Sequence, residues 1–328
     1  MFRSPTALPT GRLPEPTEVE MSMKLGLALP QRYGVDLQHD VVKVAKLAEE
    51  QGFDSVWVGE RPTFAAPGSE GLYGIPGLPW PEAYKGMCEP LTAMAAAAAV
   101  TERVRIGSSV LVPALHHPAQ LAAALATIDQ ISGGRVVAGI GSGWAHSDFD
   151  AVGVPFADRN RLLDEAFDVF EAVWGADPVE YKGGRITISG AFVGPKPVSK
   201  LPVIASGHGE KALDKVARRA DGWTPAAIPV AMVARLWDQI REKATGYGRD
   251  VSAMECVVRA NIGLSDQPID GERQPMVGSL DQVVEDFVGN AEAGATELLL
   301  ELQATVRDAD ELLDRALEIK ERLAAAGI

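Results

Sequence analysis

From Lys24 onward, short apolar runs alternate with amphipathic stretches along the whole chain. The first units are the run KLGLALP, the helical pattern VVKVAKLAEEQG and the run DSVWV. Apolar positions that recur every three or four residues predict helices, whereas short and nearly continuous apolar runs are typical of strands buried on both faces. Eight such runs are each followed by a helical pattern. This count predicts an α/β fold of the (β/α)8 type, a TIM barrel, over a doubly wound open sheet, which seldom uses so many units.

Three segments between the predicted elements are longer than ordinary barrel loops. They are Pro62–Glu89, rich in Gly and Pro, Asp177–Pro197, which contains the hairpin-like VEYKGGRITIS, and Ser265–Gly278. None has the length or the apolar content for a core of its own. We therefore expect residues 23–328 to form a single barrel domain with insertions.

The first 22 residues differ in composition from the rest of the chain. They contain Pro5, Pro9, Pro14 and Pro16 and lack the apolar stretch of a signal peptide. We expect residues 1–22 to be a flexible extension, or to precede a native start at Met21 or Met23.

The charge and the cysteine content of the chain limit the kinds of molecule that it is expected to bind. The chain of 328 residues carries a formal net charge of −14, which repels nucleic acid and anionic membrane surfaces. Its two cysteines, Cys88 and Cys256, stand far apart and form no C-x-x-C pair, which argues against a disulfide scaffold or a thiolate zinc site. We expect a cytoplasmic protein that acts on a small-molecule substrate, without a nucleic-acid or membrane partner; a homodimer stays open.

In a (β/α)8 barrel, the residues that carry chemistry lie at the carboxyl ends of the strands. The five histidines are scattered, and no lysine falls at a predicted strand end. A metal-dependent hydrolase and a Schiff-base enzyme are therefore weakly supported. What the strand ends offer is small residues and aromatic rings, which suit a large planar ligand. These positions include Ser109, Gly141, Gly143, Trp144 and Trp223.

Two glycine-rich segments fall at predicted strand ends. In GIGSGWAHSDF the glycines suggest a turn that a ligand approaches closely, with a tight strand-to-helix turn as the equal alternative. If the ligand requires them, Gly143→Val weakens its binding and leaves the stability of the free protein nearly unchanged. In ASGHGEKAL the free amides of a helix N-terminus at Gly207 and His208 favour an anion such as phosphate, again with an ordinary glycine turn as the alternative.

Five segments together carry a family resemblance. They are AEEQGFDSVWVGER, VRIGSSVLVPALHHPAQLA, GIGSGWAHSDFDAVGVPFADR, LPVIASGHGEKAL and ADGWTP, in this order. They resemble the bacterial luciferase-like superfamily of flavin and deazaflavin oxidoreductases, most closely its branch that uses coenzyme F-420. The resemblance extends from Met23 to the C-terminus. It implies a barrel with insertions, an oxidoreductase, and a cofactor ring that lies across the barrel mouth.

The resemblance also implies roles for particular residues. A cis peptide bond between Ser109 and Val110 would press against the cofactor ring, with Val112 in the same segment. Gly141 to Trp144 would flank the ring and its tail, and Trp223 is counted with this site. The backbone amides of Ser206, Gly207 and His208 would receive the cofactor phosphate.

Two positions depart from the deazaflavin sugar-phosphate dehydrogenases of this superfamily. Where those enzymes have Asp-His after the second strand and Glu after the fourth-strand glycines, this chain has Glu60-Arg61 and Trp144. A sugar-phosphate substrate is therefore less favoured. Glu60 and Arg61 are candidates to orient or polarise a substrate carbonyl, or to close the barrel rim as ion pairs. His117 is the first choice for a general acid, because the pKa of histidine is tunable.

Three functions follow, in order of preference. The first is hydride transfer between coenzyme F-420 and a small organic substrate bound under the insertion Pro62–Glu89. The second is an FMNH2-dependent monooxygenase, because FMN and coenzyme F-420 share ring shape and phosphate position. The third is a flavin-binding protein without turnover, because Arg61 stands at the usual catalytic His position.

Overall fold

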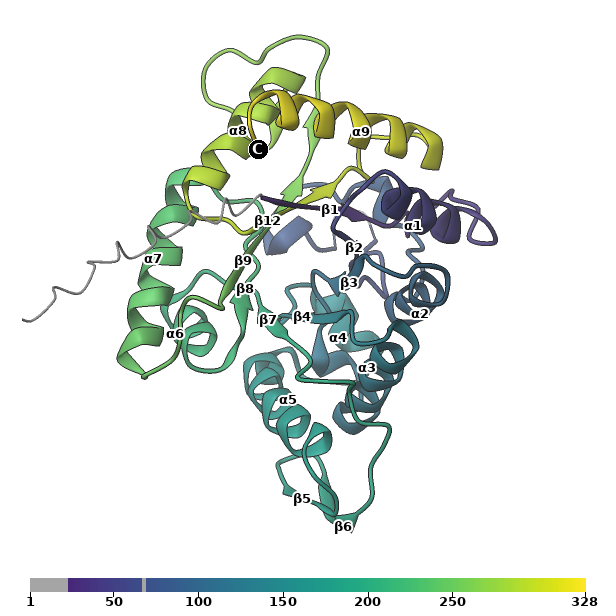
Figure 1. Ribbon diagram of the computed structural model, residues 1–328, viewed down its shortest axis with the longest axis vertical. Coiled ribbons are helices and arrows are strands. Elements are labelled where there is room, and N and C mark those ends of the chain that lie inside the picture. Colours follow the sequence, from purple (N-terminus) through teal and green to yellow (C-terminus); the bar gives the residue numbers. More distant parts are fainter. Residues whose placement is uncertain (1–22, 67–68) are drawn as a thin grey trace, which may run out of the picture.

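A closed barrel of eight parallel strands forms the centre of the molecule. The computed structural model describes residues 23–66 and 69–328, so the expectation for residues 1–22 lies outside the described residues (Figure 1). The strands follow one another around the barrel in the order β1-β12-β9-β8-β7-β4-β3-β2. Their bounds are Lys24–Ala28 (β1), Ser55–Val58 (β2), Arg105–Ser108 (β3), Val136–Ile140 (β4), Val203–Ala205 (β7), Gly222–Trp223 (β8), Glu255–Asn261 (β9) and Glu297–Glu301 (β12). The predicted TIM barrel is confirmed, because a doubly wound sheet would leave two open edges.

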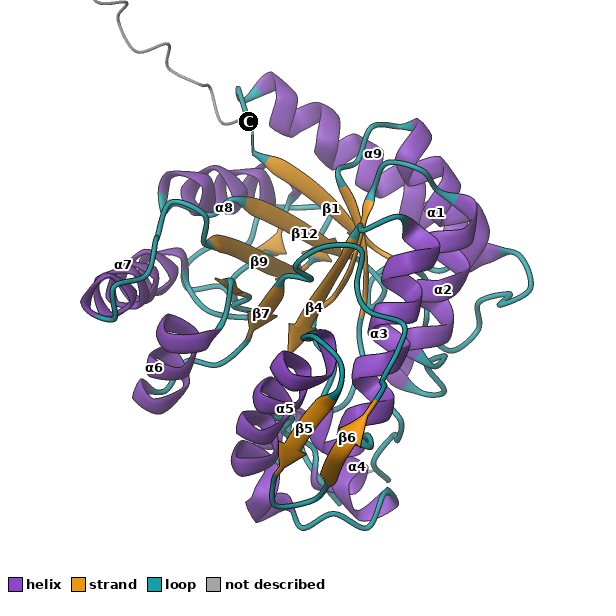
Figure 2. Ribbon diagram, turned by 60° about the horizontal axis from the view of Figure 1, so that its bottom comes forward, coloured by secondary structure: helices purple, strands orange, loops and turns teal. Residues whose placement is uncertain are grey.

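A helix follows each barrel strand and covers it from outside, as Figures 1 and 2 show. These helices are Asp40–Glu50 (α1), Pro90–Val100 (α2), Pro118–Ser132 (α3), Arg159–Trp174 (α5), Glu210–Arg219 (α6), Val230–Gly246 (α7), Leu280–Glu292 (α8) and Ala309–Ala325 (α9), with a short extra helix, His146–Ala151 (α4), after β4. At three of them, α2, α8 and α9, a side chain caps the helix start. At α2, for example, Pro90 takes the first turn and the Glu89 carboxylate accepts the amides of Leu91 and Thr92 at 3.1 and 2.7 Å.

The three insertions have different structures. The first carries two single 3-10 turns, Leu72–Gly74 and Glu82–Tyr84. The second contains an antiparallel hairpin of β5 (Val179–Lys182) and β6 (Thr187–Ala191), as the sequence predicts, which extends beside α5 in Figure 2. The third lies between two short paired strands, β10 (Gly263–Leu264) and β11 (Val277–Gly278).

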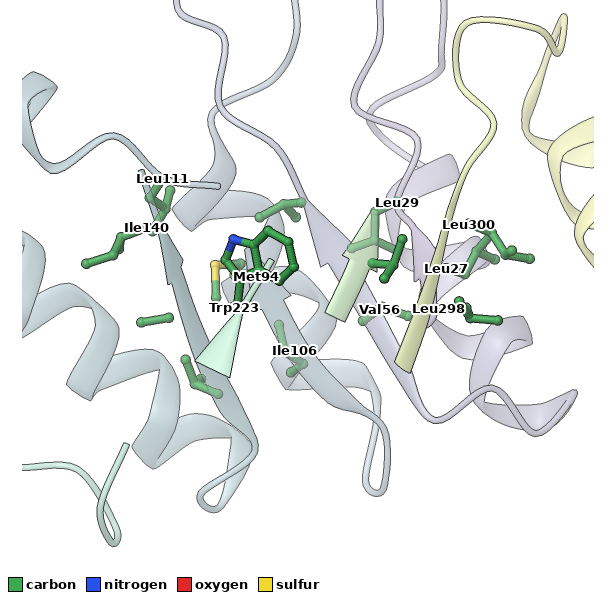
Figure 3. Close-up of a cluster of buried hydrophobic side chains, with 14 of the residues drawn as sticks. Leu27, Leu29, Val56, Met94, Ile106, Leu111, Ile140, Trp223, Leu298 and Leu300 are labelled. Atoms are coloured by element: carbon green, nitrogen blue, oxygen red, sulfur yellow. The ribbon is translucent and has the colours of Figure 1, made fainter. Parts of the chain in front are cut away.

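Alternate strand residues divide the core into two layers. Leu298 and Leu300 of β12 belong to the large cluster between strands and helices, part of which Figure 3 shows, whereas Leu299 points into the barrel. This division follows from the two-residue period of a strand. Trp57 fills the barrel interior against Leu299, and a Cβ atom on Gly107 of the neighbouring strand would overlap its ring. The interior of the barrel is therefore a packed core, and a ligand can bind only at its rim.

Charged residues close the barrel at the amino ends of the strands. Glu297 is 1% exposed and accepts hydrogen bonds from the Ser55 hydroxyl, from Trp57 Nε1 at 2.8 Å and from Arg105 Nη1 at 3.2 Å. Arg105 also pairs with Glu255 at 2.6 Å. Burial raises the pKa of Glu297 even though Arg105 and the two hydrogen bonds oppose it.

We expect Arg105→Met to lower the free energy of unfolding by about 3–5 kcal/mol, because it leaves a buried carboxyl without its cation. The loss should grow as pH rises, since the native state must then retain a proton that the unfolded chain releases. Urea unfolding at several pH values measures both effects. The control is Arg103→Met, in an exposed position two residues earlier, for which a change of less than about 1 kcal/mol is expected. Equal losses in the two variants would contradict this role of Arg105.

Candidate active site at the barrel mouth

A polar network joins the carboxyl ends of four strands. The Gln31 side chain accepts the amide of Gly59 at 2.7 Å and donates to its carbonyl at 3.1 Å. The Gln31 amide in turn donates to the Gln303 side chain at 2.7 Å. Arg259 extends the network by donating to Glu301 at 2.9 Å, to Asn261 at 3.1 Å and to the carbonyl of Ser109. These contacts connect the ends of β1, β2, β9 and β12 with the segment that follows β3.

Arg259 is the charged centre of this network. Its side chain is 16% exposed and that of Glu301 is 7% exposed. Burial alone would lower the pKa of Arg259, but the carboxylate of Glu301 and the nearby phenols of Tyr84 and Tyr73 outweigh burial, and the pKa is raised. Arg259 lies on β9 and Glu301 at the end of β12, and no sequence motif marks the two as partners.

Three of the residues predicted to bind a cofactor lie together on one side of the mouth. The peptide bond between Ser109 and Val110 is cis, as the family resemblance implies. A Cβ atom on Gly141 would lie 2.5 Å from Ser206 Oγ and 2.7 Å from Val110 Cγ2. Gly141 is buried between side chains that follow β3 and β7, and a side chain of its own would overlap both. Glycine at this position therefore lets the segments after β3, β4 and β7 pack closely together.

Gly143 requires glycine because of both its backbone conformation and its neighbours. Its φ is +75°, and a Cβ atom there would meet Phe149 and Val112, both at 2.9 Å. The expectation that a larger residue at Gly143 would spare stability is therefore wrong, because conformation and packing both require glycine. Val112 is buried, and its amide donates to Glu60 at 2.6 Å.

Glu60 forms an ion pair with His116. Its carboxylate lies 2.6 Å from His116 Nε2. Burial lowers the pKa of His116, but the hydrogen bond and the charge of Glu60 outweigh burial and raise it. His117 lies exposed at the start of α3, where its side chain has no hydrogen bond to the described part of the chain.

Arg61 is held between two aromatic rings. Its guanidinium lies 4.2 Å from the ring centre of Trp144 and 5.1 Å from that of Trp80, and it pairs with Asp148. Asp148 also accepts the Thr63 hydroxyl at 2.7 Å. Arg61 and Glu60 therefore both make the rim ion pairs that were the alternative to a substrate-orienting role.

The loop before α6 presents free amides. The amide of Ser206 donates to the carbonyl of Ile140 at 2.9 Å, so it has no proton left for a phosphate. The amides of Gly207, His208 and Gly209 donate to no group in residues 23–66 and 69–328. Trp223 has no exposed surface and donates from Nε1 to the carbonyl of Gly207 at 2.9 Å. Trp223 consequently supports this loop from within the core and does not face the mouth.

The insertion Pro62–Glu89 lies against the rim through polar contacts. Asn261 donates to the hydroxyl of Tyr73 at 3.2 Å. The Glu70 carboxylate accepts the amides of His146 and Ser147, at 2.6 and 3.3 Å, at the start of α4. The rings of Trp80 and Trp144 are 4.9 Å apart. These contacts place aromatic side chains beside the predicted cofactor position.

Two further features bear on the class of protein. Within the described residues, no three His, Cys, Asp or Glu side chains come together as a metal site. In the same part of the chain, every helix is too short or too polar to cross a bilayer.

Comparison with known proteins decides the family. The model of the luciferase-like monooxygenase family matches residues 23–276. The chain belongs to this family. The resemblance seen in the five sequence segments is thereby confirmed, and so is the assignment of the chain as an oxidoreductase.

Two curated relatives each match a little over half of the chain. An uncharacterised protein of Mycobacterium tuberculosis is 33% identical over 206 residues, 59% of this chain and 72% of that protein. The F-420-dependent glucose-6-phosphate dehydrogenase of Amycolatopsis mediterranei is 34% identical over 188 residues, 56% of this chain and 52% of that enzyme.

Solved structures share the fold at low identity. A monooxygenase of Streptomyces bottropensis has a TM-score of 0.71 and 19% identity, with coverage of 91% of this chain and 97% of that one. The coenzyme F-420-dependent tetrahydromethanopterin reductase of Methanopyrus kandleri has a TM-score of 0.69 and 18% identity, with coverage of 90% and 96%.

We expect Glu60→Gln to lower the pKa of His116, because the variant keeps an acceptor for the Val112 amide but loses the charge. A folded-state pKa above the ordinary value of about 6.5 stabilises the fold below that pH, and the contribution disappears as pH rises through the folded pKa. The variant should therefore lose more stability near pH 5.5 than near about pH 9. NMR titration of the His116 ring and urea unfolding measure the two effects. The exposed Glu82→Gln serves as control, and a pH-independent loss in Glu60→Gln would refute the pairing.

Replacement of Gly143 by Ala separates conformation from packing when it is compared with Gly153→Ala. Gly153 has a φ of +68° and no atom within 4 Å of its Cβ position, so only backbone strain of about 1–2 kcal/mol is expected there. Gly143→Ala should cost about 1–3 kcal/mol more, because Phe149 and Val112 must also move. Thermal unfolding of the ligand-free variants provides the comparison. Equal losses would show that packing at Gly143 has room to spare.

Proposed function

We propose that the chain is a coenzyme F-420-dependent oxidoreductase that moves a hydride between the cofactor and a small organic substrate. The observation that carries this proposal is the close packing at Gly141, where a Cβ atom would lie 2.5 Å from Ser206 Oγ and 2.7 Å from Val110 Cγ2, so that the segments after β3, β4 and β7 meet at one point of the mouth. A planar cofactor whose phosphate binds the amides after Ser206 would lie beside this point.

The free amides before α6 are a second argument for this cofactor, because they can bind its phosphate. The amides of Gly207, His208 and Gly209 lie at the amino end of α6, where the helix dipole adds partial positive charge. A phosphate there needs this local attraction, because the chain as a whole carries a net charge of −14. The described residues therefore fit a cofactor that joins a planar ring to a phosphate.

When bound, the deazaflavin supplies a carbon centre that accepts or donates the hydride. The chain itself orients the cofactor and the substrate and excludes water from them. Val110 and Gly141 would hold the ring, and the aromatic pair Trp80 and Trp144 would help to exclude water from the mouth. The buried Arg259 provides positive charge below the segment that follows β3.

Proton transfer to a substrate oxygen requires a nearby acid. His117 is our first candidate from the sequence, and His116 is the second because Glu60 keeps it protonated to higher pH and leaves Nδ1 free of the pair. Replacement by alanine should reduce turnover by about 100-fold at the true acid and by only a few-fold at the other. Cofactor affinity should stay within a few-fold in both. Full turnover in both variants would exclude a histidine acid.

An FMNH2-dependent monooxygenase is the second candidate, supported by the same fold in a monooxygenase structure. A flavin-binding protein without turnover is the third, since Arg61 is locked by Asp148 and two indoles. Titration of the purified chain with coenzyme F-420 and with FMN tests all three. We expect tight binding of F-420, weak binding of FMN, and cofactor reduction in a panel of alcohols. Stable FMN retention with substrate-dependent oxygen uptake would instead favour the monooxygenase.

The phosphate site can be tested at Gly209. Its φ of −76° suits proline and nothing lies within 4 Å of its Cβ position, so Gly209→Pro removes one amide donor with little strain. Gly207, whose φ is +133°, would not tolerate proline and is a poor test. We expect Gly209→Pro to weaken F-420 binding about tenfold or more, and Gly209→Ala and His208→Ala to weaken it only slightly. Fluorescence titration measures the three affinities, and equal values for Gly209→Pro and Gly209→Ala would remove the phosphate from this loop.

A further inference from the structure

Arg32 has buried hydrogen-bond donors without acceptors. Both its Nε and its Nη2 atoms are shielded from solvent, and neither has a hydrogen-bond partner within the described residues. Buried donors of a charged group without partners cost stability, and proteins seldom keep them without a use. An acceptor from outside the chain would remove this cost.

Arg32 lies at the mouth end of β1, against the first insertion. The residue before it, Gln31, donates to the carbonyl of Cys88 at 3.3 Å, and the amide of the residue after it, Tyr33, donates to the carbonyl of Ala83 at 3.2 Å. The chain around Arg32 therefore runs along residues 83–88. The insertion under which a substrate is proposed to bind thus covers this position.

The strand order separates Arg32 from the proposed phosphate site. β1 and β7 are four places apart in the closed ring of eight strands, so they lie on opposite sides of the barrel. The amides of Gly207 to Gly209 follow β7. A ring that extends from that phosphate across the mouth points toward β1, and a substrate beside the ring comes near Arg32.

The other two arginines of the mouth already have carboxylate partners. Arg61 pairs with Asp148 and Arg259 pairs with Glu301. Arg32 makes no ion pair with any described residue. Among these three arginines of the mouth, it is thus the one whose charge no carboxylate of the described residues neutralises. Because guanidinium donors match carboxylate and phosphate oxygens in pairs, the expected ligand group is an oxyanion.

We propose that Arg32 binds an anionic group, a carboxylate or a phosphate, of the substrate. The identification of the ligand as the substrate rests on the proposed function, whereas the anion site itself does not depend on that function. The proposal narrows the substrate class to small organic acids or phosphate esters with an oxidisable or reducible carbon. It also accounts for buried donors without acceptors at the end of β1.

The first test uses the cofactor-free protein and inorganic phosphate. We expect Arg32→Gln to melt no lower than the parent protein, because a donor group without acceptors is removed, and to lose about tenfold in phosphate affinity measured by calorimetry. Arg32→Lys should retain part of the affinity. The control is Arg235→Gln, an exposed arginine of α7 without an ion pair in the described structure, which should bind phosphate as the parent does.

Phosphate can also bind at the proposed cofactor loop, and Gly209→Pro separates the two sites. If both sites exist, each single variant removes one of two binding events and the double variant removes both. Loss only in Gly209→Pro, with normal binding in Arg32→Gln, would overturn the Arg32 proposal and leave the cofactor site standing. Loss only in Arg32→Gln would support Arg32 and count against the cofactor site.

The second test uses turnover with matched pairs of alcohols, with and without a carboxylate. The parent should prefer the acidic member of each pair. Arg32→Gln should raise KM for the acidic member about tenfold or more and leave kcat, the neutral member and the affinity for F-420 unchanged. No preference in the parent, or equal effects on both members, would overturn the assignment of Arg32 to the substrate.

Discussion

The arrangement of the barrel mouth depends on the hydrogen bonds and the ion pair of the Arg259 guanidinium. A buried cation needs acceptors on every side, and here they come from Glu301 at the end of β12, from Asn261 on its own strand and from the carbonyl of Ser109 after β3. Glu301 and Ser109 lie far from Arg259 in the sequence, and the fold of the barrel brings them to it. One charge thereby fixes the segment against which a cofactor ring would lie.

The rest of the mouth is arranged around this centre by pairing charges at the rim. Glu60 with His116 and Arg61 with Asp148 hold the ends of β2, β3 and β4 in contact, and the indoles of Trp80 and Trp144 cover the second pair. Catalysis by hydride transfer asks little of side chains beyond orientation and exclusion of water. A rim whose charges are already paired is consistent with that demand.

The barrel could be predicted from the sequence because buried parallel strands and amphipathic helices leave distinct periodic patterns. The strand-end rule likewise placed Val110, Gly141 and Ser206 at one rim, where they are in fact adjacent. Pairing across the closed barrel could not be predicted, so Arg259 and Glu301 received no role. The sequence also could not say whether His116 or His117 meets Glu60, because that depends on the turn at Pro113–Leu115, nor that Trp223 is fully buried.

The most direct test of the account is a crystal structure of the chain with coenzyme F-420. It should place the cofactor phosphate on the amides of Gly207 to Gly209 and the ring against Val110 and Gly141, with its far edge toward β1. A phosphate bound elsewhere, or a ring held away from Gly141, would contradict the proposal that the barrel mouth binds a deazaflavin.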